Sequence, residues 1–145
     1  MEEARLGLST TYDTRGLAST ITDSSTGVST NYCYDGAGNL TKTSGTGTSC
    51  TSAVRTYAYD AWDRMTQAVV ASGPGAGTYN YTWDGLSRMT SAGVSGAVAS
   101  YSYQGTFTDR VRAVSPTGTS DYAFGPYGPL AQKVGAAMLS RAQDG

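Results

Sequence analysis

The chain has 145 residues, the size of one ordinary domain, and a net charge of −1 at neutral pH. Leu, Ile, Val and Phe together supply only 19 residues, whereas Ser and Thr supply 38 and Gly supplies 19. So few aliphatic residues argue against an ordinary aliphatic core and are typical of disorder, which usually also brings high net charge and few aromatic residues. This chain instead has 11 Tyr and 2 Trp. We therefore expect tyrosine to build whatever core exists.

Charge and hydropathy exclude several classes of partner. The chain has ten basic and 11 acidic residues, and its pI is about 5.2. It therefore lacks the excess of positive charge that binding to nucleic acid or to an anionic membrane surface requires. No window approaches the roughly 20 apolar residues of a membrane span. Residues 1–5 lack the basic start and apolar run of a secretory signal. If the protein is exported, we expect the signal to lie elsewhere.

After an N-terminal extension (residues 1–9), a short phrase built on Tyr-Asp recurs over residues 10–131. Three central copies match the motif at most positions: residues 32–40, 57–65 and 81–89. The first copy, residues 12–17, is interpreted as lacking one turn residue. The copies after Tyr101 and Tyr122 lack the Asp. The anchoring aromatic residues are 20 to 25 residues apart: Tyr12, Tyr34, Tyr59, Trp83, Tyr103 and Phe124. A period of this length predicts a repeat architecture of about six units.

Each unit reads as a β-hairpin. Aromatic residues at i and i+2 point to the same face of a strand; the pairs are Tyr32/Tyr34, Tyr57/Tyr59, Tyr81/Trp83, Tyr101/Tyr103 and Tyr122/Phe124. An Asp follows the anchor, where its side chain can accept backbone N–H groups two residues on, as in Asx-turns; these residues are Asp13, Asp35, Asp60 and Asp84.

The second half of each unit completes the hairpin. Gly38 or Asp63 stands where a positive φ is expected, and the turn ends at Arg64 and Arg88 in two copies. The returning strand then opens on an apolar residue: Leu40, Met65, Met89 and Val111. Because a lone hairpin is barely stable in water, successive hairpins should pair side by side. The sequence predicts an all-β fold of tandem antiparallel hairpins in one continuous sheet that is able to spiral, stabilised between neighbours.

The last residues leave the repeat pattern. Residues 132–145 read as a C-terminal non-repeat tail, in which Val134–Leu139 is interpreted as helical or frayed.

The recurring Tyr-x-Tyr-Asp-x-x-Gly-Arg/Asn-Leu phrase resembles the YD repeat of the RHS (rearrangement hotspot) family, also found in toxin-complex shells and teneurins. The resemblance runs from about Tyr12 to Leu130 and rests mainly on the three central copies. It implies a hairpin ribbon that spirals into a hollow shell, which in bacterial members encloses a C-terminal toxin. The family's Asp-Pro cleavage motif and toxin segment are absent here, and six hairpins could hardly close a shell. We therefore expect a fragment or short member of a larger protein.

The two cysteines, Cys33 and Cys50, could close a loop of about 17 residues, and a disulfide there would contribute roughly 3 kcal/mol. An oxidised pair would fit an extracytoplasmic protein. Two incidental free thiols are the alternative.

Composition also bears on catalysis. Without His, Ser-His-Asp and Cys-His schemes and most zinc sites are excluded, and we predict no catalytic residues, metal or cofactor. Asp35, Asp60 and Asp84 could in principle act as a carboxylate pair, but their identical repeat position favours a turn role. Asp63-Arg64 and Asp109-Arg110 read as solvated turn charges.

Two functions follow. The first is a non-enzymatic structural or encapsulating module of a secreted or cell-surface RHS-like protein, with further repeats, shell segments and an enclosed toxin as partners. The alternative is a carbohydrate-binding module that uses exposed aromatic rings. Trp62 lies in a turn where other copies have Ala37 or Leu86, so it is the best candidate for a glycan contact.

Overall fold

The structure, a computed structural model, describes residues 7–45, 50–125, 128–135 and 137–140. The chain divides into two compact units, Met1–Thr78 and Tyr79–Gly145. The described residues form strands, turns and bends and contain no helix, so none of them could span a membrane as a helix. The all-β prediction of tandem antiparallel hairpins is confirmed.

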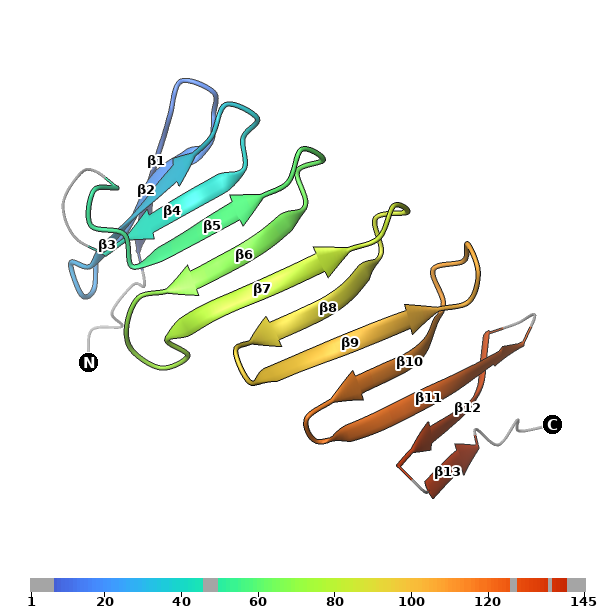
Figure 1. Ribbon diagram of the computed structural model, residues 1–145. Coiled ribbons are helices and arrows are strands. Elements are labelled where there is room, and N and C mark those ends of the chain that lie inside the picture. The colour runs from blue at the N-terminus through green and yellow to red at the C-terminus, as the bar shows by residue number, and fades with distance from the viewer. Residues whose placement is uncertain (1–6, 46–49, 126–127, 136, 141–145) are drawn as a thin grey trace. The chain divides into compact units, whose positions relative to one another are not determined.

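In each unit the strands pair antiparallel with their neighbours in the chain (Figure 1). The first unit holds β1 (Leu8–Tyr12), β2 (Ala18–Asp23), β3 (Ser29–Tyr34), β4 (Leu40–Ser44), β5 (Arg55–Tyr59) and β6 (Met65–Val70). The second holds most of β7 (Gly77–Trp83), then β8 (Met89–Val94), β9 (Ala97–Tyr103), β10 (Arg110–Ser115), β11 (Gly118–Gly125), β12 (Gly128–Val134) and β13 (Ala137–Ser140).

The strand that enters each repeat turn ends at or near the anchoring aromatic residue. Tyr34 pairs with Leu40 and Tyr59 with Met65, and each pairing is accompanied by a register shift that leaves one residue of the returning strand unpaired. Trp83 pairs with Met89 in the same way. The shift is a β-bulge, which increases the local twist of the strands.

The prediction that the first copy lacks a turn residue is wrong. Tyr12 pairs with Ala18, and the N–H of Asp13 donates to the carbonyl of Leu17 at 2.8 Å, so the turn has the same length as in the central copies. Leu17 therefore occupies the last turn position, and Ala18 opens the returning strand.

Two further readings of the second unit were wrong. Arg110, not Val111, pairs with Tyr103 and opens the returning strand: the fifth turn is one residue longer than the others, whereas Val111 would require a turn two residues longer. Within residues 132–145, Gln132 pairs with Tyr122, and β13 pairs with β12 from Ala131 to Val134. The segment read as helical or frayed therefore continues the strand pairing as far as Ser140.

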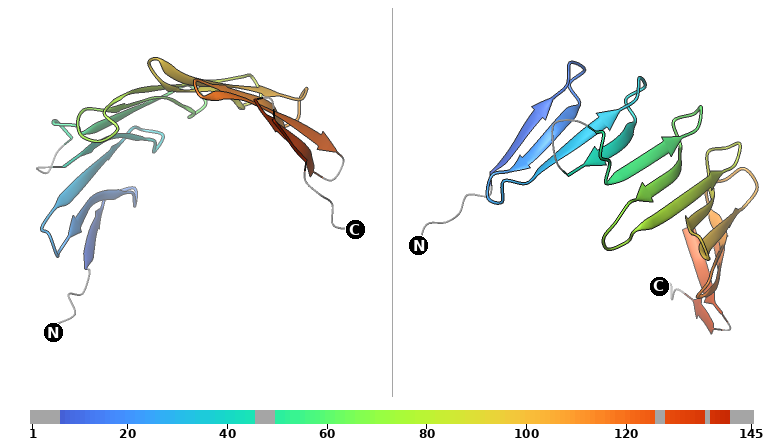
Figure 2. Two further views of the ribbon diagram at one scale, coloured as in Figure 1. Left: turned by 90° about the horizontal axis from the view of Figure 1, so that it is seen from below. Right: turned by 60° about the vertical axis from the view of Figure 1, so that its left-hand side comes forward.

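Few side chains are fully enclosed. Figure 2 shows that the strands of each unit form one layer, and the buried residues among those described are Ala68, Asn31, Thr43 and Ser44. The paired aromatic residues are half-buried, because neighbouring side chains on the same face cover them only at the sides. Tyrosine thus builds a half-covered face rather than a closed core.

A disulfide joins Cys33 of β3 to Cys50, beyond the end of β4. The two Cα atoms are 6.3 Å apart, within the range that a disulfide can bridge. The bond ties the connection between β4 and β5 back to the neighbouring hairpin of the first unit.

Candidate functional site

The most regular site is the repeat turn that follows each anchor. In the third copy, Asp60 Oδ1 accepts the backbone N–H groups of Trp62 and Arg64 at 2.9 and 3.1 Å. Asp13, Asp35 and Asp84 make the same pair of bonds to the residues two and four positions on. One carboxylate oxygen therefore satisfies two turn donors that strand pairing leaves over.

The backbone of the turn closes on itself as well. The N–H of Asp60 donates to the Arg64 carbonyl at 3.0 Å, and the N–H of Asp63 donates to the Asp60 carbonyl at 3.1 Å. The third residue after the Asp has positive φ in four copies, namely Gly16, Gly38, Asp63 and Ser87. Asp63 and Ser87 hold this conformation at φ near 58° and 59° without being glycine, an arrangement that persists only where surrounding bonds enforce it.

Arg64 is an integral part of the turn, and its reading as a solvated charge was wrong. Its Nε and Nη2 donate to Asp60 Oδ2 at 2.7 and 2.6 Å, and its side chain is only 16% exposed. Arg88 holds Asp84 with the same distances. Two guanidinium N–H groups thus converge on a single carboxylate oxygen and form charge-assisted hydrogen bonds.

Side chains of one turn also bind the next turn along the sheet. Arg15 Nη1 donates to the Asp35 carbonyl at 2.6 Å, and Asn39 Nδ2 donates to Asp63 Oδ1 at 2.7 Å. In the second unit, Arg88 Nη1 donates to the carbonyls of Gly105 and Phe107 at 2.6 and 2.7 Å. We call these links between successive turns the turn ladder.

The anchoring tyrosines supply a second set of links that sequence reasoning missed. The hydroxyl groups of Tyr34, Tyr59 and Tyr103 donate to the carbonyls of Ala18, Leu40 and Met89 at 3.0, 3.0 and 2.7 Å. Each acceptor opens the returning strand of the preceding hairpin. The repeat spacing could have indicated these bonds, because each acceptor residue lies 14 to 19 residues before its tyrosine in the sequence.

The turn carboxylates are held in their ionised form. Hydrogen bonds from the Arg64 and Arg88 side chains are the main cause that lowers the pKa values of Asp60 and Asp84 below the ordinary 3.8. Backbone N–H groups of Leu17 and Asn39 do the same for the pKa values of Asp13 and Asp35. Groups with this bonding act as fixed acceptors, and none is poised as a general acid at neutral pH.

These shifts predict acid sensitivity. Because the folded-state pKa values lie below the unfolded-state values, the unfolded chain binds more protons in the intervening range, and stability falls as pH decreases through it. We expect the melting temperature to be nearly constant from pH 7 to about pH 5 and to drop below about pH 4. Thermal unfolding followed by circular dichroism checks this. The control is the double variant Asp60→Asn/Asp84→Asn, whose melting temperature should fall less steeply as the pH is lowered into the acid range. A melting temperature unchanged down to about pH 2 would contradict the expectation.

Trp62 lies at the tip of the third turn. Its side chain is 64% exposed, and the Arg64 guanidinium lies 4.5 Å from the centre of its ring. Tyr12 and Phe107 are equally exposed, at 65% each, so exposure alone does not single Trp62 out as a glycan contact.

Replacing Trp62 by alanine should leave the fold intact. The change removes one cation–π contact at an exposed site, worth about 0.5–1 kcal/mol, and no buried area of consequence. We expect the melting temperature to fall by only a few degrees, as measured by circular dichroism. A large drop would show that the indole ring has a structural role in the turn.

The structure places the three candidate carboxylates in different turns. Among the described residues, no group of three or more potential metal ligands gathers at one place. Asp35, Asp60 and Asp84 belong to separate turns, in which each is bonded to its own backbone N–H groups.

No protein-family model matches the sequence, and no curated protein matches it. Solved structures do. The chain is similar to part of a crystal structure of a TcdB2–TccC3–Cdc42 assembly, with a TM-score of 0.70, 15% identity, 86% of this chain covered and 7% of the matched chain covered. It is similarly close to part of the Tc holotoxin pore of Photorhabdus luminescens, with a TM-score of 0.69, 15% identity and the same coverage of 86% and 7%.

These comparisons show a shared fold. At 15% identity the likeness lies in the backbone, and the chain spans only 7% of the length of the chains that it matches. The class of protein defined here is therefore an array of tandem β-hairpins, with a fold that also occurs within toxin complexes.

Proposed function

We propose that the chain is a section of the wall of an RHS-like secreted or cell-surface protein, in which successive hairpins build a shell around a toxin. The role of this chain is structural, because it continues a sheet that separates an enclosed polypeptide from solvent. It has no catalytic role.

One observation carries the proposal. Three junctions between successive hairpins carry both a turn-to-turn link and a tyrosine hydroxyl-to-carbonyl link, as between Arg15 and Asp35 and between Tyr59 and Leu40. Such links can be repeated without limit along the sheet, which is what a wall requires. The side chains of Arg15, Asn39 and Arg88 bond to neighbouring turns of the array, which favours continuity of the sheet over ligand binding.

The similar structures support the same conclusion. Both belong to assemblies described as parts of Tc toxins or their TcdB2–TccC3 components. The disulfide between Cys33 and Cys50 supports an extracytoplasmic location, because such bonds persist in oxidising compartments.

Protease protection tests the proposal. The chain would be tagged in its native source, in whatever longer protein or complex contains it, and purified without denaturant from medium and cell-surface fractions. We expect it to copurify with a polypeptide that resists trypsin in the assembly and is digested quickly once the assembly is opened with urea. The same polypeptide produced alone serves as the control and should be digested at the fast rate.

Two results would contradict the proposal. One is a chain of 15.0 kDa that purifies as a compact monomer with no associated polypeptide. The other is an associated polypeptide that trypsin digests equally fast inside and outside the assembly.

A further inference from the structure

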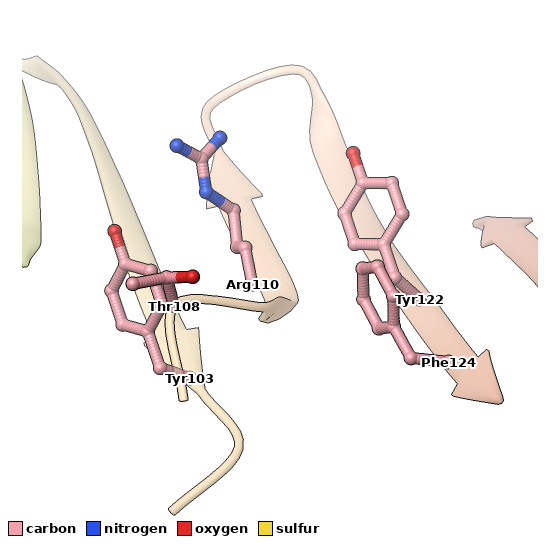
Figure 3. Close-up of a pocket in the computed structure, with 5 residues that line it drawn as sticks. All are labelled: Tyr103, Thr108, Arg110, Tyr122 and Phe124. Atoms are coloured by element: carbon pink, nitrogen blue, oxygen red, sulfur yellow. The ribbon is translucent and has the colours of Figure 1, made fainter. Parts of the chain in front are cut away.

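A pocket lies on one face of the second unit, between the fifth hairpin and β11. It has a volume of about 370 Å³, is open to solvent, and is lined by Tyr103, Thr108, Arg110, Tyr122 and Phe124. Figure 3 shows Arg110 between Tyr103 on one side and the rings of Tyr122 and Phe124 on the other. The guanidinium group points toward the same end of the pocket as the hydroxyl groups of Tyr103 and Tyr122.

The pocket lies where the array departs from its own pattern. Leu40, Met65 and Met89 pair with the anchoring aromatic residue and open the returning strand in three hairpins. In the fifth hairpin Arg110 holds this position opposite Tyr103. A cation thus stands where the repeat elsewhere has an apolar side chain.

A second departure coincides with the first. Tyr34, Tyr59 and Tyr103 use their hydroxyl groups to bind the residue that opens the preceding returning strand. The next anchor is Phe124, which, like Trp83, has no phenolic hydroxyl group, so this tie to the Arg110 carbonyl cannot form. The fifth turn also begins with Gln104 in place of Asp and is one residue longer.

Arg110 is available for a ligand. Its guanidinium stacks 4.1 Å from the centre of the Tyr101 ring, an arrangement that covers one face of the group and leaves the N–H donors at its edge free. In the described part of the chain no carboxylate lies within ion-pair distance of it, whereas Arg15, Arg64, Arg88 and Arg112 each have an Asp partner. None of the residues that line the pocket is acidic.

The lining therefore combines three kinds of group. Arg110 offers a fork that matches a carboxylate. The rings of Tyr103, Tyr122 and Phe124 offer apolar faces, and the hydroxyl groups of Thr108 and Tyr122 can exchange hydrogen bonds with ligand hydroxyl groups. A pocket with apolar walls and a few oriented polar groups is the usual form of a small-molecule site.

We propose that this pocket binds an acidic sugar, with the carboxylate of a hexuronate on Arg110 and the sugar ring against the aromatic walls. The ring hydroxyl groups bond to Thr108 and Tyr122. This site is independent of the wall function, and it differs from the glycan contact expected at Trp62, which belongs to the other unit.

The test is an NMR titration of the full ¹⁵N-labelled chain with sodium D-glucuronate, with D-glucose and sodium benzoate as comparison ligands at the same ionic strength. We expect saturable shifts confined to residues around the fifth hairpin, with a dissociation constant on the order of 1 mM for so small a ligand. Glucose should bind at least about tenfold more weakly, because it lacks the charged hydrogen bonds to Arg110.

Two arginine variants isolate the role of the cation. Arg110→Met installs the residue that other hairpins carry at this position, so it should fold, and it should weaken glucuronate binding about tenfold or more. Arg112→Met removes an arginine outside the pocket and should leave binding unchanged. Unaltered amide spectra away from the fifth hairpin confirm that both variants fold.

Several results would overturn the proposal. They are an absence of saturable shifts with glucuronate, equal binding of glucose, equal binding of benzoate, or unchanged affinity in Arg110→Met. None of these results affects the wall function, which the protease experiment tests separately.

Discussion

Replacing Gly93 by alanine should destabilise the second unit by about 1–3 kcal/mol, the usual range for forcing extra atoms into a closely packed place. Gly93 pairs with Val98 across the β8–β9 hairpin. A Cβ atom on Gly93 would lie 2.7 Å from the Val98 Cα atom and closer still to the Ala97 carbonyl oxygen. Both neighbours are backbone atoms, so neither can move aside without distorting the hairpin.

Urea unfolding measures this effect. In a Trp62→Phe background, Trp83 is the remaining tryptophan and its fluorescence follows the second unit. Gly85→Ala is the matched control, because a Cβ there meets nothing within 4 Å and φ is not positive, and its effect should stay within about 0.5 kcal/mol. Equal stability of the two alanine variants would show that the hairpin accommodates the extra atom.

Removing the disulfide with Cys33→Ser/Cys50→Ser should lower the free energy of unfolding of the first unit by about 3 kcal/mol. The two cysteines are 17 residues apart, and the bond restricts the unfolded chain by an amount that follows from this loop length. The first unit has little apolar core to stabilise it otherwise, since Ala68 is the one buried apolar side chain among the described residues. The loss should therefore be a large fraction of the unit's stability.

Urea unfolding followed through Trp62 fluorescence in a Trp83→Phe background, with and without dithiothreitol, checks the second prediction. The reductant should destabilise the natural chain to about the level of the variant and leave the variant unchanged. Two free thiols in the natural chain after purification under oxidising conditions, or equal stability of both proteins, would contradict it.

The hairpins could be predicted from the sequence because they depend on interactions between residues close together in the chain. Aromatic residues at i and i+2 mark strands, and the following Asp accepts N–H groups within its own turn, as Asp60 does from Trp62 and Arg64. These relations span at most four residues. They depend on φ, ψ and side-chain reach, which the residues themselves fix. The repeat period then fixes the fold class, because hairpins of this kind must pair with one another to be stable.

Contacts between side chains on different strands could not be predicted from the sequence, because they depend on the strand register. Arg110 was assigned to a solvated turn, but the longer fifth turn moves it opposite Tyr103. A change of one residue in turn length decides which side chain faces the aromatic row.

The sequence alone thus determined the period, the all-β hairpin class, the Asp-built turns and the residues of the aromatic face. The tertiary structure decided the tyrosine hydroxyl links, the turn ladder, the strand pairing of β12 and β13, and the pocket around Arg110. The physical reason is distance along the chain: the first set arises from contacts within a few residues. The second set joins groups on different strands or turns, and their meeting is fixed only when bulges and pairing set the register.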